Sequence, residues 1–99
     1  MDIDDEIKTL QYLYSWLLED FSYLLKVKEY AKNSVLRHLY IAAKNESTDI
    51  VNSRDEIKLH ELRGAYEVLR YTVDKEFGYT DAEIASREQE RKDFIAQNY

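Results

Sequence analysis

Few side chains in this sequence could carry out chemistry near neutral pH. The chain has no cysteine, so it can form no thiolate nucleophile, disulfide or cysteine metal site. Its two histidines, His38 and His60, do not stand in the His-x-x-x-His or Glu-x-x-His spacings of common zinc and di-iron sites. Its two glycines, Gly64 and Gly78, are isolated, which excludes a glycine-rich phosphate loop. We therefore expect no metal and no cofactor.

Arg54 and His60 form one pair whose types and spacing suit catalysis. An arginine can bind a phosphate while an imidazole transfers protons near neutral pH. Arg54-Asp55, followed by His60, resembles the Arg-polar-x-x-x-x-His signature of HEPN-type ribonucleases. The resemblance implies a dimeric helical bundle in which Arg54 and His60 would meet at the dimer seam and cleave RNA. The other interpretation is structural, with Arg54 on the surface of a first helical turn and His60 partly exposed on a helix.

A basic segment predicts a second, weaker kind of site. Residues 26–44 carry five cations and a single acid, Glu29, whereas the whole chain has a net charge of −6. This local excess of positive charge could hold a phosphate or a nucleotide. The residues concerned are Lys26, Lys28, Lys32 and Arg37. Alternatively, the segment only neutralises an acidic segment beside it in the bundle, or matches the dipoles of helix ends.

Aromatic residues give a signal of a different class, because nine Tyr, one Trp and three Phe make up 13% of the chain. One row of them lies two residues out of phase with the main apolar stripe of the first helix, and thus on roughly its opposite face. The row consists of Tyr12, Trp16, Tyr23 and Tyr30. Trp and Tyr are frequent anchors of protein interfaces. We predict that this row binds a partner protein, unless another helix of the same chain covers it.

Apolar residues at helical spacing predict the elements that would position these side chains. Two stripes alternate steps of four and three residues, as one face of a helix does. The first is Ile3, Ile7, Leu10, Tyr14, Leu17, Phe21 and Leu24, and the second is Leu59, Leu62, Tyr66, Leu69, Val73 and Phe77. A single first helix of about forty residues would be about 60 Å long. Because a compact domain of this size cannot cover it, we predict a break near Asn33.

Capping residues and polar clusters predict where the helices begin and end. Acidic residues at the N-terminus can cap the first helix, and the polar run 45–49 predicts a loop. The segments Ser53–Glu56 and Thr80–Glu83 fit capping boxes, and Gly78 can end a helix in the left-handed conformation. We therefore expect helices near 3–31, 34–45, 54–77 and 81–97.

The composition predicts one all-α domain spanning residues 1–99. A chain of 99 residues with no Pro and two Gly has few turn signals, which suits a few long helices better than strands. We expect a small bundle of three to four antiparallel helices. Because the first helix is apolar on two opposed faces, we expect oligomerisation to complete this bundle.

Charge and the N-terminal sequence indicate which partners and which cellular location to expect. A net charge of −6 argues against nucleic-acid binding, which relies on cations that neutralise phosphates. The N-terminus lacks the features of a signal peptide, and the longest apolar run is interrupted by Glu19 and Asp20 and is too short to span a membrane. We expect a cytoplasmic protein that binds itself and another protein, and no membrane. The best-fitting function is an acidic interaction module, such as a phage-like accessory regulator, inhibitor or adaptor, rather than an enzyme.

Overall fold

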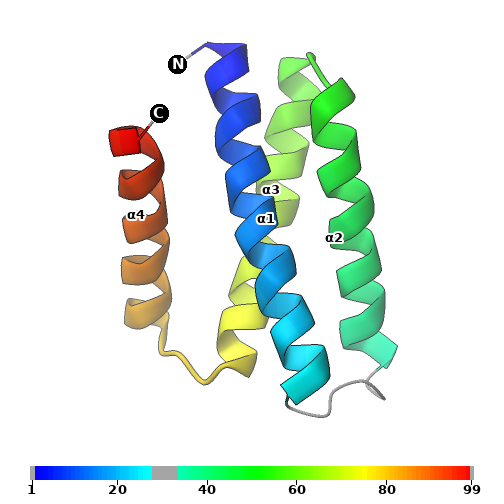
Figure 1. The fold of residues 1–99 in the computed structure, drawn as a ribbon, viewed down its shortest axis with the longest axis vertical. Coiled ribbons are helices and arrows are strands. Elements are labelled where there is room, and N and C mark those ends of the chain that lie inside the picture. The colour runs from blue at the N-terminus through cyan, green and yellow to red at the C-terminus, as the bar shows by residue number, and fades with distance from the viewer. Residues whose placement is uncertain (1, 28–33, 99) are drawn as a thin grey trace.

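The computed structural model describes residues 2–27 and 34–98, and this part of the chain forms four helices and no strand. They are α1 (Ile3–Val27), α2 (Ser34–Asn52), α3 (Glu56–Glu76) and α4 (Asp81–Asn98). Figure 1 shows the chain running down α1, up α2, down α3 and up α4. The predicted all-α helical bundle is confirmed. Helices α1 and α2 are described on either side of residues 28–33, and the predicted break near Asn33 lies outside the described residues.

The first helix begins and packs as its sequence pattern predicts. The Asp2 carboxylate accepts a hydrogen bond of 2.9 Å from the backbone N–H of Asp5, which caps the helix. Acidic side chains in the first turn also interact favourably with the helix dipole. The predicted stripe is the centre of the core, because five of its residues are almost fully buried: Leu10, Tyr14, Leu17, Phe21 and Leu24. The predicted end of this helix at residue 31, and Tyr30, lie outside the described residues.

The second helix continues through the predicted loop at 45–49, so that prediction is wrong. Helix α2 extends to Asn52. Its residues Leu36, Ala43 and Ile50 are spaced seven apart, so they lie on one face of the helix, and all three are buried. The Thr48 hydroxyl donates to the carbonyl of Lys44, four residues earlier, at 3.1 Å. Polar side chains that favour loops thus bond within the helix, while burial of Ile50 stabilises the extra turns.

The third helix has a different cap from the one predicted. Helix α3 begins at Glu56 rather than residue 54, and the Asp55 carboxylate accepts a 2.9 Å hydrogen bond from the N–H of Ile57. Ser53 does not cap it, because its hydroxyl donates instead to the carbonyl of Asp49 at 2.7 Å. The predicted stripe from Leu59 to Val73 is buried.

The turn from α3 to α4 follows its sequence signals closely. Gly78 adopts the left-handed conformation with φ of 89°. Its N–H donates to the carbonyl of Lys75 at 3.0 Å, and the N–H of Tyr79 donates to the carbonyl of Asp74 at 3.2 Å, which is a Schellman ending. Thr80 and Glu83 then form the predicted capping box, with hydrogen bonds of 3.2 Å and 2.9 Å.

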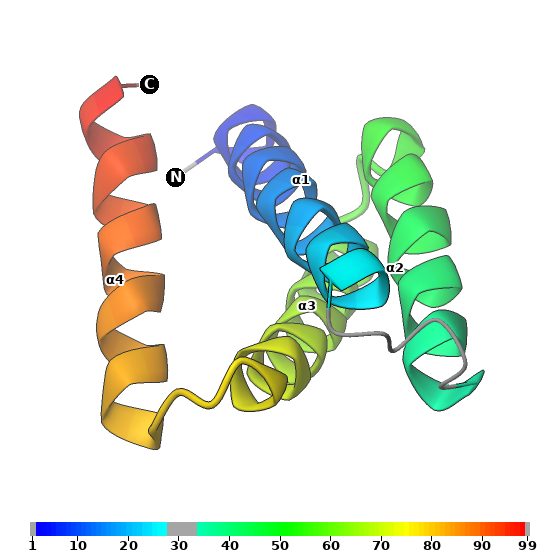
Figure 2. The same ribbon diagram turned by 60° about the horizontal axis from the view of Figure 1, so that its bottom comes forward.

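The main apolar core lies between α1, α2 and α3, and α4 stands on the other side of α1 and α3 from α2 (Figure 2). Helix α4 is only weakly amphipathic, and Ile84 and Ile95 are its buried residues. Within the described residues, none of the helices combines the length and the apolar character needed to cross a membrane.

Candidate functional site

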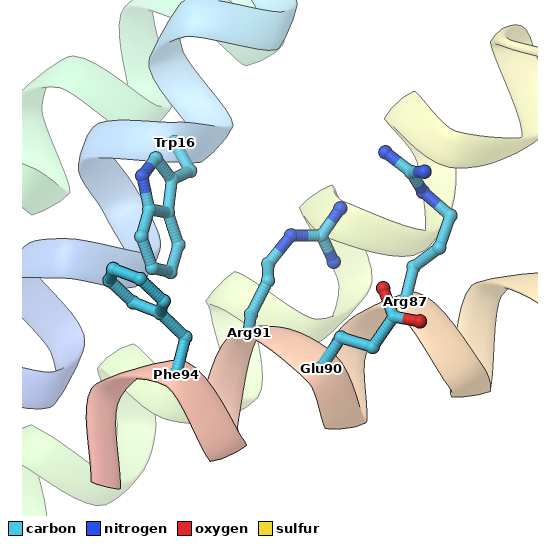
Figure 3. Close-up of a pocket in the computed structure, with 5 residues that line it drawn as sticks. All are labelled: Trp16, Arg87, Glu90, Arg91 and Phe94. Atoms are coloured by element: carbon cyan, nitrogen blue, oxygen red, sulfur yellow. The ribbon is translucent and has the colours of Figure 1, made fainter. Parts of the chain in front are cut away.

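An open cleft lies between the middle of α1 and α4. Trp16 is half-buried on α1, and its ring meets the Phe94 ring of α4 edge-on with centroids 5.9 Å apart. Phe94 itself stays 50% exposed. Together with Arg87, Glu90 and Arg91 these two rings line a cleft of about 230 Å³. Figure 3 shows both arginines rising from α4 on the side of Trp16 and α3.

Aromatic contacts continue from this cleft to the end of α3. The Arg87 guanidinium lies over the Tyr79 ring at 4.3 Å, a favourable cation–π geometry. The Tyr79 ring is 6.1 Å from that of Phe77, which stacks on Tyr23 of α1 at 5.8 Å. Tyr23 is 50% exposed. We call the whole series the aromatic band: Tyr12, Trp16, Phe94, Arg87, Tyr79, Phe77 and Tyr23.

The structure places the predicted partner-binding row partly under other helices of the same chain. Tyr12 is half-buried with its ring 6.2 Å from Trp16, which α4 covers through Phe94. Tyr23 remains exposed on one side, and Tyr30 lies outside the described residues. The row is therefore not a bare helix face: Trp16 lines the cleft between α1 and α4, which we call the groove, and Tyr23 stacks on Phe77.

Sequence reasoning missed the residues that α3 and α4 contribute to this groove. The sequence pattern places Phe77 in an apolar stripe and singles out neither Phe94 nor Tyr79. Arg87 carried no signal at all. The dense cluster of aromatic residues around Gly78 was the one feature that could have indicated a second wall.

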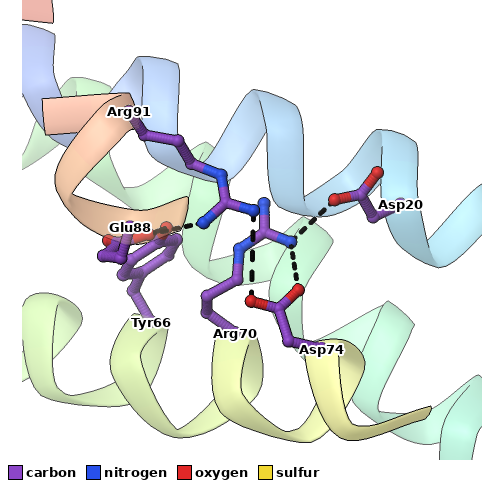
Figure 4. Close-up of polar contacts among 6 residues, drawn as sticks. All are labelled: Asp20, Tyr66, Arg70, Asp74, Glu88 and Arg91. Carbon is purple, nitrogen blue, oxygen red and sulfur yellow. Dashed lines mark hydrogen bonds and ion pairs between the residues drawn. The ribbon is translucent and has the colours of Figure 1, made fainter. Parts of the chain in front are cut away.

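Ion pairs lie beneath the groove, where α1, α3 and α4 meet (Figure 4). Arg70 is 2% exposed, and its Nη1 donates to Asp20 at 2.7 Å and to the fully buried Asp74 at 3.2 Å. From α4, Arg91 lies 4.0 Å from Asp74 and donates to Glu88 at 2.8 Å. The Tyr66 hydroxyl also donates to Glu88 at 2.8 Å. We call this the buried ion cluster: Asp20, Tyr66, Arg70, Asp74, Glu88 and Arg91.

Burial changes the proton affinity of several groups in this region. It raises the pKa of Asp74, although the guanidinium groups of Arg70 and Arg91 oppose that shift. Burial also raises the pKa of Tyr66 far above its ordinary value, so its hydroxyl stays a donor to Glu88. Burial alone would lower the pKa of Arg70, but Tyr66, Asp20 and Asp74 outweigh it, and the pKa is raised. Arg70 therefore stays charged inside the protein.

Arg54 and His60 lie near the start of α3, away from the groove. Arg54 is exposed and pairs with Asp4 of α1 at 2.7 Å. His60 is exposed and lines a polar cleft of about 290 Å³ with Ile3, Glu6, Glu56 and Arg63, whereas Arg54 is not among the lining residues. The ribonuclease hypothesis stays a prediction, which RNA-cleavage assays of the wild type and of His60→Ala would test.

Half of the predicted phosphate site falls outside the described residues. Lys28 and Lys32 belong to residues 28–33, while Lys26 and Arg37 are exposed at the end of α1 and the start of α2. Arg37 borders a small cleft with Ser34, His38 and Ile41. This site also stays a prediction. In the described part of the chain, no three carboxylate or imidazole groups are placed to share a metal ion.

The sequence matches no family model, no curated protein and no solved structure. What the protein does must therefore be inferred from its own side chains.

Proposed function

We propose that this protein is a protein–protein interaction module, and that it binds its partner along the groove between α1 and α4. The observation that supports this best is the aromatic band, in which Tyr23 and Phe94 are both half exposed and Phe94 shares the cleft lining with Arg87. Trp, Tyr and Arg are the residue types that dominate binding energy at protein interfaces. A small acidic regulator, inhibitor or adaptor would act by placing this band on another protein.

The charges in the groove indicate what the partner should carry. Arg87 makes no ion pair within the described residues, and its guanidinium lies over the Tyr79 ring at 4.3 Å. A guanidinium positioned in this way can bind a carboxylate through two parallel hydrogen bonds. A partner segment with an apolar side chain for Trp16 and Phe94 and a nearby carboxylate for Arg87 would match the groove.

We also propose that the protein associates with itself. Large apolar side chains remain exposed on the helices outside the groove, among them Val35, Ile41, Val51, Ile57 and Val68. Single exposed residues are ordinary, but their number on so small a chain supports a further apolar contact.

The groove can be tested with two tyrosines of similar exposure. Tyr23 in the band is 50% exposed, and Tyr71 outside it is 46% exposed. Proteins captured by the tagged wild type are identified, purified and titrated against each variant. We expect Tyr23→Ala to weaken binding about 30-fold, the effect of a typical interface anchor worth about 2 kcal/mol. Tyr71→Ala should bind as the wild type does.

Unfolding measurements on the same variants separate binding from folding. Tyr23→Ala should change the urea midpoint far less than Leu17→Ala, because Leu17 is fully buried. Trp16→Ala should fall between them, since Trp16 is half-buried. Wild-type affinity in Tyr23→Ala would contradict the proposal, and collapse of all three variants would show that the row is ordinary core.

A further inference from the structure

Helix α4 fits its place in the bundle less closely than the other helices do. A cleft of about 540 Å³ on one flank has an apolar floor that includes Leu10, Leu13 and Tyr66, and α4 offers it the small side chain of Ala96. A further cleft of about 310 Å³ runs along α3 beside Ala85. The cleft at Trp16 borders the opposite flank. Helix α4 is therefore bordered by open space on both sides, and it touches the bundle along a narrow strip.

The strip that α4 covers combines two buried isoleucines, Ile84 and Ile95, with charged groups that lack full hydrogen bonding. Arg70 Nε and Nη2, Asp74 Oδ2 and Glu88 Oε2 find no hydrogen-bond partner among the described groups. Charged groups that are buried with incomplete hydrogen bonding recover only part of the hydration free energy that they lose on leaving water. When α4 lifts away, these groups regain water. Docking of α4 therefore depends on particular side-chain partners but contributes little net free energy.

The connection to α4 contains a natural hinge. Residues 77–80 join the two helices, and Gly78 within them takes the left-handed conformation with φ of 89°. That conformation is accessible to glycine and to a lesser extent asparagine, and it is costly for other residues. A change of backbone conformation at this one residue would redirect the whole of α4.

We propose that α4 exchanges between two copies of this chain, so that each copy's α4 docks on the α1 and α3 of the other. The occupant that fits the strip is α4 itself, because its matching contacts are already visible: Glu88 with Tyr66, Arg91 with Asp74, and Phe94 with Trp16. Exchange of α4 would form each of these contacts between the two chains instead of within one. Only the backbone conformation of the hinge would change. The inference rests on the proposed self-association, and it makes the groove composite, with α1 from one copy and Arg87 and Phe94 from the other.

Cysteine cross-linking tests the exchange directly, because the natural chain has no cysteine. Thr9 of α1 and Gln89 of α4 line the same cleft. A Thr9→Cys chain and a Gln89→Cys chain are refolded together and treated with a short bis-maleimide. Exchange predicts a covalent heterodimer. The matched control mixes Asp4→Cys with Arg54→Cys, whose side chains pair between α1 and the connection that precedes α3. That contact stays within one chain, so the control pair should give no heterodimer.

The two glycines provide a second, independent test. Gly78→Val penalises the closed turn, and we expect it to lower the dimer dissociation constant at least about tenfold, as a penalty of 1–2 kcal/mol per hinge implies. Gly78→Asn tolerates the left-handed turn and should behave as the wild type. Gly64→Ala is the further control, because a Cβ there meets nothing within 4 Å. Its dissociation constant should not change.

Light scattering over a range of concentrations distinguishes the outcomes. Exchange is supported if the Thr9→Cys and Gln89→Cys chains give a covalent heterodimer, the control pair gives none, and Gly78→Val dimerises more tightly than the wild type. A dimer without that cross-link overturns exchange and leaves self-association standing. A monomer at every concentration, for the wild type and Gly78→Val alike, overturns both, whereas binding of another protein at Tyr23 would be unaffected.

Discussion

The two sides of α3 are stabilised in different ways. On the side of α1 and α2 the contacts are apolar, with Leu17, Phe21 and Ile50 fully buried. On the side of α4 they are ion pairs around Arg70 and Asp74, joined by a few aromatic contacts. Apolar burial is non-directional and nearly proportional to area, whereas buried charges need particular partners. The first side therefore fixes the fold, and the second side can be remodelled.

A core truncation should have the largest effect and should act on the whole protein. Leu17→Ala removes a fully buried side chain from the three-helix core and should cost about 2–5 kcal/mol of unfolding free energy. Ile84→Ala on α4 should cost less, since it packs at the edge. Urea titrations followed by circular dichroism measure both. Equal losses would mean that α4 belongs to the same cooperative core.

Breaking the buried ion cluster should loosen α4 in particular. Asp74→Ala removes the most deeply buried carboxylate and leaves Arg70 with Asp20 and Arg91 with Glu88, and we expect a loss of about 2 kcal/mol. The loss stays below the 3–5 kcal/mol typical of a broken buried pair because α4 can lift and let water in. Trp16 is the only tryptophan and contacts α4, so its emission should shift towards that of an exposed indole.

The double variant Arg70→Met/Asp74→Leu is the matched control for that experiment. Replacing a whole buried pair with apolar residues of similar size is often neutral or stabilising. We expect stability close to that of the wild type and unshifted Trp16 emission. An emission shift as large as that of Asp74→Ala would show that the ion pairs themselves hold α4.

Two buried tyrosines allow the same change on each side of α3. The Tyr14 hydroxyl donates to the carbonyl of Leu62 at 3.0 Å inside the three-helix core, and that of Tyr66 donates to Glu88 of α4 at 2.8 Å. Each Tyr→Phe change should cost about 1 kcal/mol. Hydrogen exchange should accelerate throughout the bundle in Tyr14→Phe and chiefly in α4 in Tyr66→Phe. Identical exchange patterns would contradict the difference between the two sides.

Acid should have the smallest effect at the start of α4. The backbone N–H of Thr80 lowers the pKa of Glu83, and the Tyr71 hydroxyl lowers that of Asp81. Each carboxylate thus binds its proton less readily in the folded chain, so its contribution is complete above the ordinary pKa. It is lost as pH falls through the lowered, folded pKa. Amide exchange in the first turn of α4 should rise there, and Glu83→Gln should reduce this pH dependence to the part that Asp81 contributes.

Asp74 should respond in the opposite sense. Its pKa is raised in the folded chain, so the folded state binds this proton more readily, and the cost of burying its charge is relieved as pH falls through that raised value. Comparing the stability of Asp74→Asn with that of Glu83→Gln over the same pH range separates the contribution of Asp74 from that of Glu83.

Much of the fold could be predicted from the sequence because periodicity and capping are local. The stripes through Leu17 and Leu69 are buried as predicted, and the caps at Thr80 and Gly78 form as predicted. Local signals failed at 45–49, where polar residues favour a loop. There the burial of Ile50 against the core outweighs them, and the core is a tertiary feature.

The candidate site was predictable only in part. Trp16 and Tyr23 stand out because they lie opposite the main stripe of α1, a property of helical spacing alone. Arg70 and Asp74 carry no such mark, since charges four residues apart usually form an exposed pair on a helix. They are buried where α1, through Asp20, and α4, through Arg91, meet over α3. The sequence by itself determined which helices form and which face of each is apolar. The tertiary structure decided which charges are buried and where the groove opens, because both depend on how α4 meets α1 and α3.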